Sequence, residues 1–236
     1  MRADVVHRAS MPLIPGWCTL ESMRLVRPVP HACFAVPPRR GTLVLAHGAS
    51  AAMDTQFMQR FAVHAAKAGL DVVRFEFGYM AQRRIDGVRR PPPKAETVVP
   101  EFTAALETVL AESEGPVLIG GKSMGGRVAA MVGGLPDLDS RVKAVVCLGY
   151  PFHPTGQPEK LRLGPLKALR IPALIVQGTR DPYGDEKEVA TYTLPPLVTI
   201  VWSENGNHDL APTGASPATW NGNIEAAAKA AAGVLG

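Results

Sequence analysis

Cysteine is scarce in this sequence, whose 236 residues include only Cys18, Cys33 and Cys147. None of the three stands in a Cys-x-x-Cys pair or in a Cys/His cluster, which excludes the common zinc-binding patterns. An odd number of scattered cysteines also excludes the disulfide framework of a small secreted domain. We therefore expect free thiols, a reducing compartment and a cytoplasmic location.

Long apolar runs and a strong charge imbalance are also missing. No apolar run reaches the length that a membrane span needs, and the N-terminus lacks the apolar core of a secretory signal. The 25 basic and 21 acidic residues give a net charge of +4, too weak to indicate a nucleic-acid partner. Hydrophobic residues, in contrast, make up 46% of the chain. This composition predicts a globular protein with no membrane span, and it leaves the oligomeric state open.

The chain divides into a short leader and one long patterned region. Residues 1–22 show no clear period, and we interpret them as an N-terminal leader that is either disordered or not part of the working protein. Over residues 23–236, short apolar runs alternate with helical patterns, which predicts a single α/β domain with a mostly parallel sheet and helices on both faces. The predicted strands are Thr42–Ala46, Asp71–Phe77, Val117–Gly120, Val142–Leu148, Ala173–Val176 and Leu197–Trp202. Their nearly continuous apolar character predicts burial on both faces.

Between these runs, apolar residues recur at helical spacing. Phe57, Phe61 and Ala65 form one such stripe, with Asp54 as the expected N-cap. The segment Gly78–Lys94 has no periodicity, so we expect a long loop there, and loops of that length tend to be functional or mobile. Further helices are predicted around Val99–Leu110, Ser123–Gly133, Glu186–Tyr192 and Asn223–Val234.

The sharpest motif is G-x-S-x-G, formed by Gly121, Ser123 and Gly125 directly after a predicted strand and before a predicted helix. A serine in such a turn adopts a strained conformation, and the two glycines remove side chains that would collide there. The alternative is a glycine-rich turn without catalysis. The GKS sequence also matches the end of a phosphate-binding loop, but that motif needs a glycine where this chain has Pro116. We therefore predict that Ser123 is a nucleophile.

A serine hydroxyl needs a base to remove its proton, and the base needs an acid to orient it. Asp181 follows the fifth predicted strand, and His208 follows the last one. Where a nucleophile elbow supplies the serine, the acid follows it in the sequence and the histidine comes last. This chain has the same order, which predicts a triad of Ser123, Asp181 and His208. An aspartate before a proline is also a common turn former, and a loop histidine is often only solvated. Asp185 and Asp209 remain alternative acids.

Two backbone amides are candidates for stabilising the charge that develops on a substrate carbonyl. In the segment LAHGAS the N–H of Ala49 is the expected first donor, and the N–H of Met124, directly after the nucleophile, is the second. We expect His47 to shape this loop instead of acting as the base, and His153 either to contact substrate or to face water. Such a site calls for no metal and no organic cofactor.

Basic side chains gather after the second predicted strand. Loops at the carboxyl ends of parallel strands line the site in open α/β sheets, which makes Arg83 and Arg84 candidate substrate contacts. An anionic small-molecule substrate or an acidic partner would then be favoured. The alternative is a solvated basic loop, made rigid by the three prolines at 91–93. The basic residues are Arg83, Arg84, Arg89, Arg90 and Lys94.

With these residues in place, the chain from about residue 41 to its end resembles the α/β-hydrolase superfamily. The segments HGAS, GKSMGG, GTRDPYG and NGNHDL stand in the family's order. More narrowly, the chain resembles the small, lidless, dienelactone-hydrolase-like members, although dienelactone hydrolase itself uses a cysteine nucleophile. The GYM segment followed by RR and RRPPP is similar to a group that includes a testis-expressed protein and a subunit of a histone-acetyltransferase complex. The resemblance implies hydrolase machinery, and it also implies that some relatives are interaction modules.

The spacing of the strands bears on the shape of the site. Too few residues separate Leu148 from the strand near Ile171 for the helical cap that larger members of the superfamily insert there, so an open, shallow cleft is expected. We therefore predict an α/β-hydrolase fold without a cap domain. The expected reaction is hydrolysis of a carboxylic ester or thioester through an acyl-enzyme on Ser123. An interaction module on the same scaffold and an acyltransferase are the alternatives.

Overall fold

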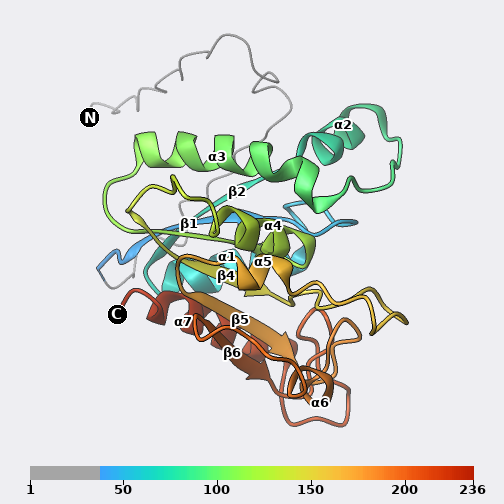
Figure 1. The fold of residues 1–236 in the computed structure, drawn as a ribbon. Helices are drawn as coiled ribbons and strands as arrows, with labels where there is room; N and C mark the ends of the chain where they lie inside the picture. The colour runs from blue at the N-terminus through green and yellow to red at the C-terminus, as the bar shows by residue number, and fades with distance from the viewer. Residues whose placement is uncertain (1–37) are drawn as a thin grey trace, which may run out of the picture.

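The computed structural model describes residues 38–236, which contain one sheet of six parallel strands in the order β2-β1-β3-β4-β5-β6 (Figure 1). Each strand begins and ends within two residues of a predicted strand, so the predicted parallel sheet is confirmed. The leader predicted for residues 1–22, its boundary with the domain, and two of the three cysteines lie outside the described residues. The strands are β1 (Gly41–Ala46), β2 (Leu70–Phe75), β3 (Val117–Lys122), β4 (Val142–Leu148), β5 (Ala173–Gly178) and β6 (Val198–Ser203).

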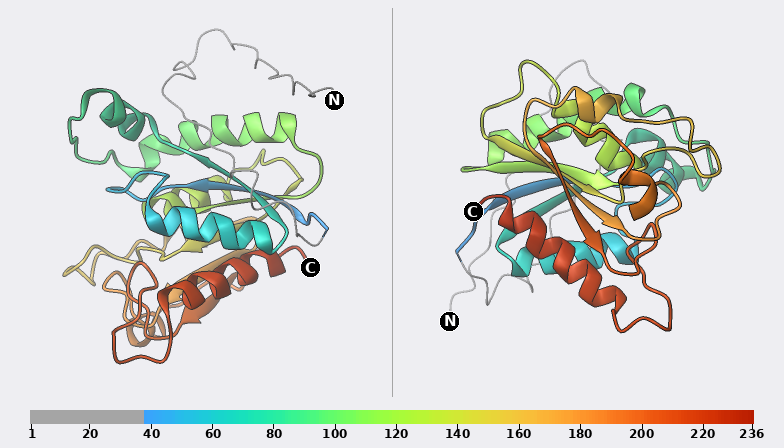
Figure 2. Two further views of the ribbon diagram at one scale, coloured as in Figure 1. Left: turned by 180° about the vertical axis from the view of Figure 1, so that it is seen from behind. Right: turned by 60° about the horizontal axis from the view of Figure 1, so that its bottom comes forward.

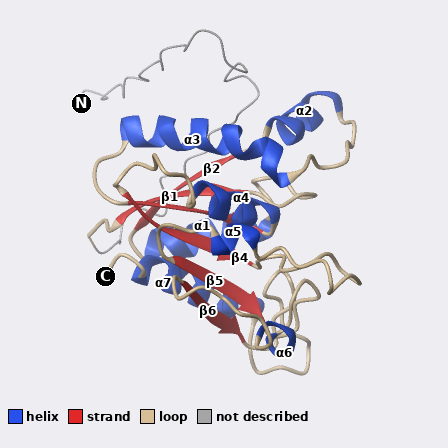
Figure 3. Ribbon diagram, in the orientation of Figure 1, coloured by secondary structure: helices blue, strands red, loops and turns tan. Residues whose placement is uncertain are grey.

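Helices cover both faces of the sheet, which Figure 3 separates by colour from the strands. Figure 2 shows α1 and α7 side by side on one face, with α3, α4 and α5 on the other. Within residues 38–236, no helix combines the length and the apolarity that a membrane crossing requires. The helices are α1 (Gln56–Lys67), α2 (Gly78–Asp86), η3 (Ala95–Val98), α3 (Val99–Glu112), α4 (Met124–Val132), α5 (Gly164–Lys167), α6 (Glu186–Val189) and α7 (Trp220–Gly233).

Successive strand residues point to opposite helix layers and so build two cores. In β1, Val44 packs with α3 and α4, whereas Leu45 packs with α1 and α7, and both side chains are fully buried. Phe75 and Phe102 meet edge to face in the first core, with 5.2 Å between ring centroids. Burying a large apolar side chain contributes about 1.5–3 kcal/mol to stability. The two cores therefore fix the strand ends, where the candidate site lies.

Burial on both faces holds for β1, β3 and β5, and it is wrong for β6. Side chains in β6 alternate between half-buried and exposed, and Val201 is 37% exposed. In this edge strand only the alternate side chains Val198, Ile200 and Trp202 pack against a core, whereas the other edge strand, β2, is covered on both faces. An apolar run alone does not distinguish an edge strand from a central one.

The expected N-cap of α1 is also wrong. Thr55 precedes the first turn and makes no side-chain cap. The carboxylate of Asp54 instead lies 2.7 Å from the guanidinium of Arg84, a residue of α2. The Asp54 side chain, which the local pattern assigned to the helix cap, therefore forms a long-range ion pair instead.

The segment predicted as a long loop begins with a helix, α2, and continues as coil from Gly87 to Lys94. Only Met80 and Ala81 are buried in α2, so the helix has no apolar stripe for a periodicity to detect. The helix ends at Gly87, whose φ of 70° lies in the left-handed region that glycine adopts at little cost.

Candidate functional site

The carboxyl ends of the parallel strands meet at one edge of the sheet. Ser123 follows β3, and its N–H donates to the carbonyl of Leu148 at the end of β4. Asp181 lies after β5 and His208 after β6, while Ala49 lies after β1. Loops at these ends of a parallel sheet form the usual crevice for ligands. The structure thus brings all of the predicted triad and oxyanion residues to the same edge.

The turn at Ser123 is strained in the way that a nucleophile elbow requires. Its φ of 52° and ψ of −115° are rarely adopted by a residue with a side chain. A Cβ at Gly121 would lie 2.4 Å from the backbone of Gly125, and a Cβ at Gly125 would lie 2.6 Å from the carbonyl oxygen of His47. Glycine is needed at both positions because the turn packs directly against other backbone.

Asp181 and His208 form a buried hydrogen-bonded pair. Nδ1 of His208 lies 2.8 Å from Oδ2 of Asp181, whose side chain is fully buried. An ionised carboxylate can only accept, so Nδ1 carries the proton and Nε2 keeps a free lone pair. The imidazole is 20% exposed. This is the geometry of a base whose tautomer is set by an acid.

The loop that carries Asp181 is held by a side chain that sequence analysis missed, Gln177. Its Nε2 donates to Oδ2 of Asp181 at 3.0 Å and to the carbonyl of Gly184 at 3.0 Å, while its Oε1 accepts from the N–H of Tyr150 at 2.7 Å. The N–H of Tyr183 donates to the other carboxylate oxygen at 2.9 Å. The sequence does contain a signal for this role, because Gln177 is a single amide in the otherwise apolar strand ALIVQG. A buried amide needs hydrogen-bond partners.

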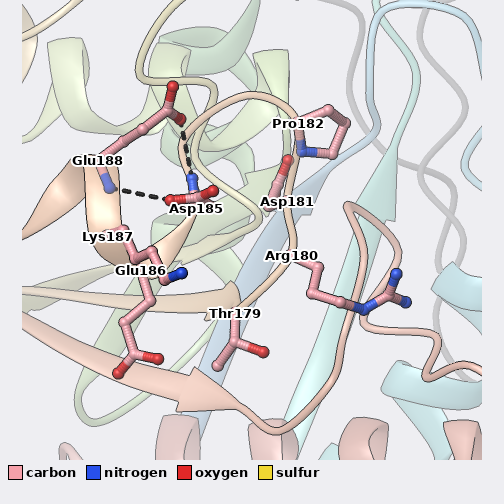
Figure 4. Close-up of a pocket in the computed structure, with 8 residues that line it drawn as sticks. All are labelled: Thr179, Arg180, Asp181, Pro182, Asp185, Glu186, Lys187 and Glu188. Atoms are coloured by element: carbon pink, nitrogen blue, oxygen red, sulfur yellow. Dashed lines mark hydrogen bonds between the residues drawn. The ribbon is translucent and has the colours of Figure 1, made fainter.

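Figure 4 shows Asp181 on the turn between β5 and α6, among residues that line a cavity of about 410 Å³. Asp185, an alternative acid, caps α6 instead: it accepts from the N–H of Glu188 at 2.9 Å, and the Glu188 side chain accepts from the N–H of Asp185 (Figure 4). This capping box uses the Asp185 carboxylate for local structure.

Close packing fixes the imidazole of His208. A Cβ at Gly149 would lie 3.2 Å from Nδ1 of His208 and 2.8 Å from its carbonyl oxygen. The ring of Tyr183 lies against the imidazole, with 4.3 Å between centroids. Within residues 38–236, neither Nε2 of His208 nor the hydroxyl of Ser123 has a hydrogen-bond partner. Catalytic hydrogen bonds are often long in unliganded enzymes and tighten when substrate binds.

The loop that carries the predicted oxyanion amide of Ala49 lies beside Ser123, and the second predicted amide belongs to the next residue, Met124. A Cβ at Gly48 would lie 3.7 Å from Cβ of Ser123, which places the loop containing Ala49 directly against the elbow. Met124 begins α4, where first-turn N–H groups have no acceptor within the helix. The Tyr79 hydroxyl donates to the carbonyl of Ala49 at 2.8 Å and so fixes that peptide.

His47 shapes this loop, as predicted. Its Nε2 accepts from the N–H of Phe77 at 3.1 Å, and its Nδ1 lies 2.7 Å from the carbonyl oxygen of Gly48. Burial lowers the pKa of His47, which keeps the ring neutral. A neutral imidazole can accept through one nitrogen while it donates through the other, as these two contacts require.

The loop of residues 47–53, which carries Ala49 and is called the oxyanion loop below, has a second support, which is ionic. The buried carboxylate of Glu76 accepts from Nε of Arg84 at 2.6 Å and from the N–H of Met53 at 3.3 Å. Arg84 also pairs with Asp54, and it holds the pKa of that carboxyl below its usual range. Arg84, a predicted substrate contact, is therefore used to brace the segment around Met53, whereas Arg83 makes no ion pair with any described residue.

A further buried charge lies within the elbow motif itself. Nζ of Lys122 is 3.4 Å from Oδ1 of Asp209, and the lysine side chain is only 8% exposed. Burial lowers the pKa of Lys122. Asp209, the other alternative acid, follows His208 directly, so the pair joins the end of β3 to the loop that carries the imidazole.

His153 is placed as a structural residue. Its side chain is 3% exposed, its Nδ1 lies 2.8 Å from the carbonyl oxygen of Pro154, and its Nε2 lies 3.3 Å from Glu188. With both ring nitrogens engaged and almost no exposed surface, the imidazole does not face substrate. The prediction that it would contact substrate or water is corrected by this burial.

The cysteine that the structure describes, Cys147, is a free thiol, as predicted. Burial raises its pKa to about 12, so the thiolate that reacts with electrophiles is nearly absent at neutral pH. Across residues 38–236, no group of three histidine, cysteine, aspartate or glutamate side chains is arranged to hold a metal ion.

Comparisons with known proteins agree with this arrangement. A family model described as an alpha/beta hydrolase domain matches residues 39–236. The chain is similar in structure to a dienelactone hydrolase from Anabaena variabilis, with 20% identity and a TM-score of 0.61 over 89% of this chain and 95% of that one. A serine hydrolase without a lid from Xanthomonas campestris matches with 19% identity and a TM-score of 0.59 over 80% of each chain. A serine hydrolase homologue from Coxiella burnetii matches with 20% identity and a TM-score of 0.58, over 79% and 82%.

Proposed function

Since the chain belongs to the alpha/beta hydrolase domain family, we propose that it is a serine hydrolase of carboxylic esters or thioesters with Ser123, His208 and Asp181 as its triad. One observation carries the proposal: a buried aspartate orients a histidine, with its free nitrogen available, at the same sheet edge as a strained serine. The residues need no metal or organic cofactor for this chemistry. The expected substrate is a small molecule or an acyl group on a carrier.

In the acylation step, Nε2 of His208 takes the proton of the Ser123 hydroxyl while Oγ forms a bond to the substrate carbonyl carbon. Negative charge moves to the carbonyl oxygen, where the N–H groups of Ala49 and Met124 are the proposed donors. The carbonyl then re-forms, the bond to the alcohol or thiol leaving group breaks, and the imidazolium gives its proton to that group. Asp181 stabilises the imidazolium throughout.

Deacylation repeats the sequence with water. Nε2 of His208 takes a proton from water, the resulting oxygen attacks the acyl carbon, and the Ser123 oxygen leaves with the proton that the imidazolium returns. An acyltransferase would use the same groups with another nucleophile in place of water. The connection between β4 and β5 contains only the four-residue α5, so nothing in it resembles a cap that would keep water from the acyl-enzyme. We therefore favour hydrolysis.

A second candidate function rests on the surface near α2. Ile85 is 70% exposed and Val88 is 51% exposed, beside the basic Arg89 and Arg90. An exposed apolar and basic segment of this kind suits an acidic protein partner. This interaction-module alternative corresponds to the narrower resemblance to a testis-expressed protein and a histone-acetyltransferase subunit, which stays a prediction. A cytoplasmic location likewise stays a prediction.

A fluorophosphonate probe tests the proposal, because such a reagent modifies a serine that a working base activates. The intact mass of the wild-type protein should increase by one adduct, and Ser123→Ala and His208→Ala should each abolish it. Ser140→Ala is the matched control, since that serine is exposed before β4, at the opposite edge of the sheet, and it should label fully. No adduct on a wild-type protein shown to be folded by circular dichroism would overturn the proposal in favour of the interaction module.

A further inference from the structure

A cavity of about 180 Å³ begins at the oxyanion loop and extends over α2. Its lining includes Ala49, Ser50 and Tyr79 together with three arginines, Arg83, Arg89 and Arg90. A second cavity of about 420 Å³ shares Ser50 and Arg83 with the first. Arg83 therefore lines two neighbouring hollows at the same end of the sheet.

The charges of these arginines are not equally compensated. Arg90 pairs with Asp86 at 2.6 Å. The guanidinium groups of Arg83 and Arg89, in contrast, make no hydrogen bond or ion pair with any residue in the range 38–236. The lining of the smaller cavity contains no carboxylate, and the Tyr79 hydroxyl stays neutral because burial raises its pKa. Two positive charges in one cavity repel each other, and a bound anion would remove that repulsion.

The cavity lies next to Ser123, separated from it by the backbone of Gly48 and Ala49. A Cβ at Gly48 would lie 3.7 Å from Cβ of Ser123, and the next residue, Ala49, lines the cavity. A substrate carbonyl bound between Ser123 and the Ala49 amide would therefore have the arginine-lined cavity beside it. Guanidinium groups recognise carboxylates and phosphates through paired N–H donors.

We infer that Arg83 and Arg89 form a subsite for an anionic group of the ester substrate, a carboxylate or a phosphate, held a few bonds from the reacting carbonyl. The inference rests on the proposed hydrolase function and adds the class of substrate to it. The Ser50 hydroxyl is the neutral donor of the same subsite. Arg90, which Asp86 already holds, contributes background charge and no direct contact.

Two matched pairs of esters test the subsite with the full-length protein. The first compares the 4-nitrophenyl half-ester of glutarate with 4-nitrophenyl pentanoate, so that the charge is on the acyl side. The second compares the pentanoate esters of 3-carboxy-4-nitrophenol and of 4-nitrophenol, so that the charge is on the leaving group. We expect wild type to prefer the charged ester in at least one pair. Arg83→Gln should lower kcat/KM for that ester about 10-fold to 100-fold and leave its neutral partner nearly unchanged.

Arg89→Gln provides a second variant, located in coil and independent of helix α2. Arg170→Gln is the matched control, because it removes the same charge from an exposed position before β5, at the opposite edge of the sheet. A similar loss in Arg170→Gln would indicate long-range charge only and would overturn the subsite. Equal kcat/KM within both wild-type pairs would overturn it as well.

Failure of the subsite and failure of the hydrolase function are separable. Calorimetric titration of Ser123→Ala with glutarate, and separately with inorganic phosphate, measures the subsite without turnover. If wild type hydrolyses no ester, the proposed function fails, and binding that disappears in Ser123→Ala/Arg83→Gln still supports the subsite. Stronger binding of one ligand identifies carboxylate or phosphate as the preferred group. No binding of either ligand overturns the inference.

Discussion

The two halves of the candidate site are held by different forces. The acid and base half depends on short hydrogen bonds among buried groups, with Gln177, Asp181 and His208 in one connected chain. The oxyanion half adds ion pairs to the hydrogen bonds of His47 and Tyr79, and in these pairs Arg84 joins the buried Glu76 to the exposed Asp54. Hydrogen bonds between buried groups respond little to salt, whereas a partly exposed ion pair is screened by it. We infer that added salt changes the orientation of His208 less than it changes the position of the oxyanion loop.

The largest effect is expected from a substitution in the acid and base half of the site. Asp181→Asn should lower kcat about 10⁴-fold, because an amide that donates to Nδ1 stabilises the wrong imidazole tautomer. Steady-state ester hydrolysis measures it. Asp185→Asn is the matched control, since asparagine retains the cap of α6 and activity should stay within a few-fold of wild type. Equal losses in the two variants would contradict the assignment of Asp181.

The next largest effect is expected from a substitution in the oxyanion half of the site. Arg84→Gln should lower the free energy of unfolding by about 3 kcal/mol, because it leaves the buried Glu76 carboxylate without its cation. Chemical denaturation measures the loss, and added salt should weaken wild type more than this variant. The control Arg90→Gln removes an exposed pair and should cost less than about 1 kcal/mol. If the double variant Arg84→Gln/Glu76→Gln regains stability, the loss in Arg84→Gln comes from the unpaired Glu76 carboxylate. An unchanged loss of unfolding free energy in the double variant would refute this explanation.

A smaller effect is expected at Gln177. Gln177→Leu removes the donor that holds Asp181, and it should cost about 2 kcal/mol of unfolding free energy because a buried charged acceptor loses a hydrogen bond. We expect kcat to fall about tenfold as the carboxylate loses its orientation. Gln59→Leu, on the exposed face of α1, should stay within about 0.5 kcal/mol of wild type. Activity that is insensitive to Gln177→Leu would mean that Asp181 is oriented by other contacts.

The smallest effect concerns the pH dependence of stability at Lys122. Its folded pKa is lowered by burial, so the unfolded state binds more protons between that pKa and the unfolded value, and stability rises with pH across this window. Lys122→Met should remove this slope, which is at most about 1.4 kcal/mol per pH unit. Urea unfolding of both proteins from neutral to alkaline pH measures the difference. The exposed Lys143→Met should keep the wild-type slope, and a slope retained in Lys122→Met would contradict the burial argument.

The sheet and the chain order of the proposed triad residues were predictable because both follow from local pattern. Apolar runs mark strands, and Ser123, Asp181 and His208 each come after the end of a strand. The helix α2 was not predictable by this route, since it buries only two side chains and lacks a stripe. Asp54 shows the second limit: its side chain fits a helix cap locally, but Arg84, thirty residues later, takes it. Supporting partners depend on tertiary contact, and no spacing in the sequence records them.

Gly121 and Gly125 have a consequence for protein engineering. Their α-carbons approach neighbouring backbone so closely that a methyl group would lie 2.4 to 2.6 Å from main-chain atoms, which cannot rotate away as a side chain can. The turn at Ser123 is therefore packed against the end of β1 through main-chain contact. A library that randomises this segment will recover variants at Lys122 and Met124 far more readily than at either glycine, and the elbow can be transplanted only together with the strand end that receives it.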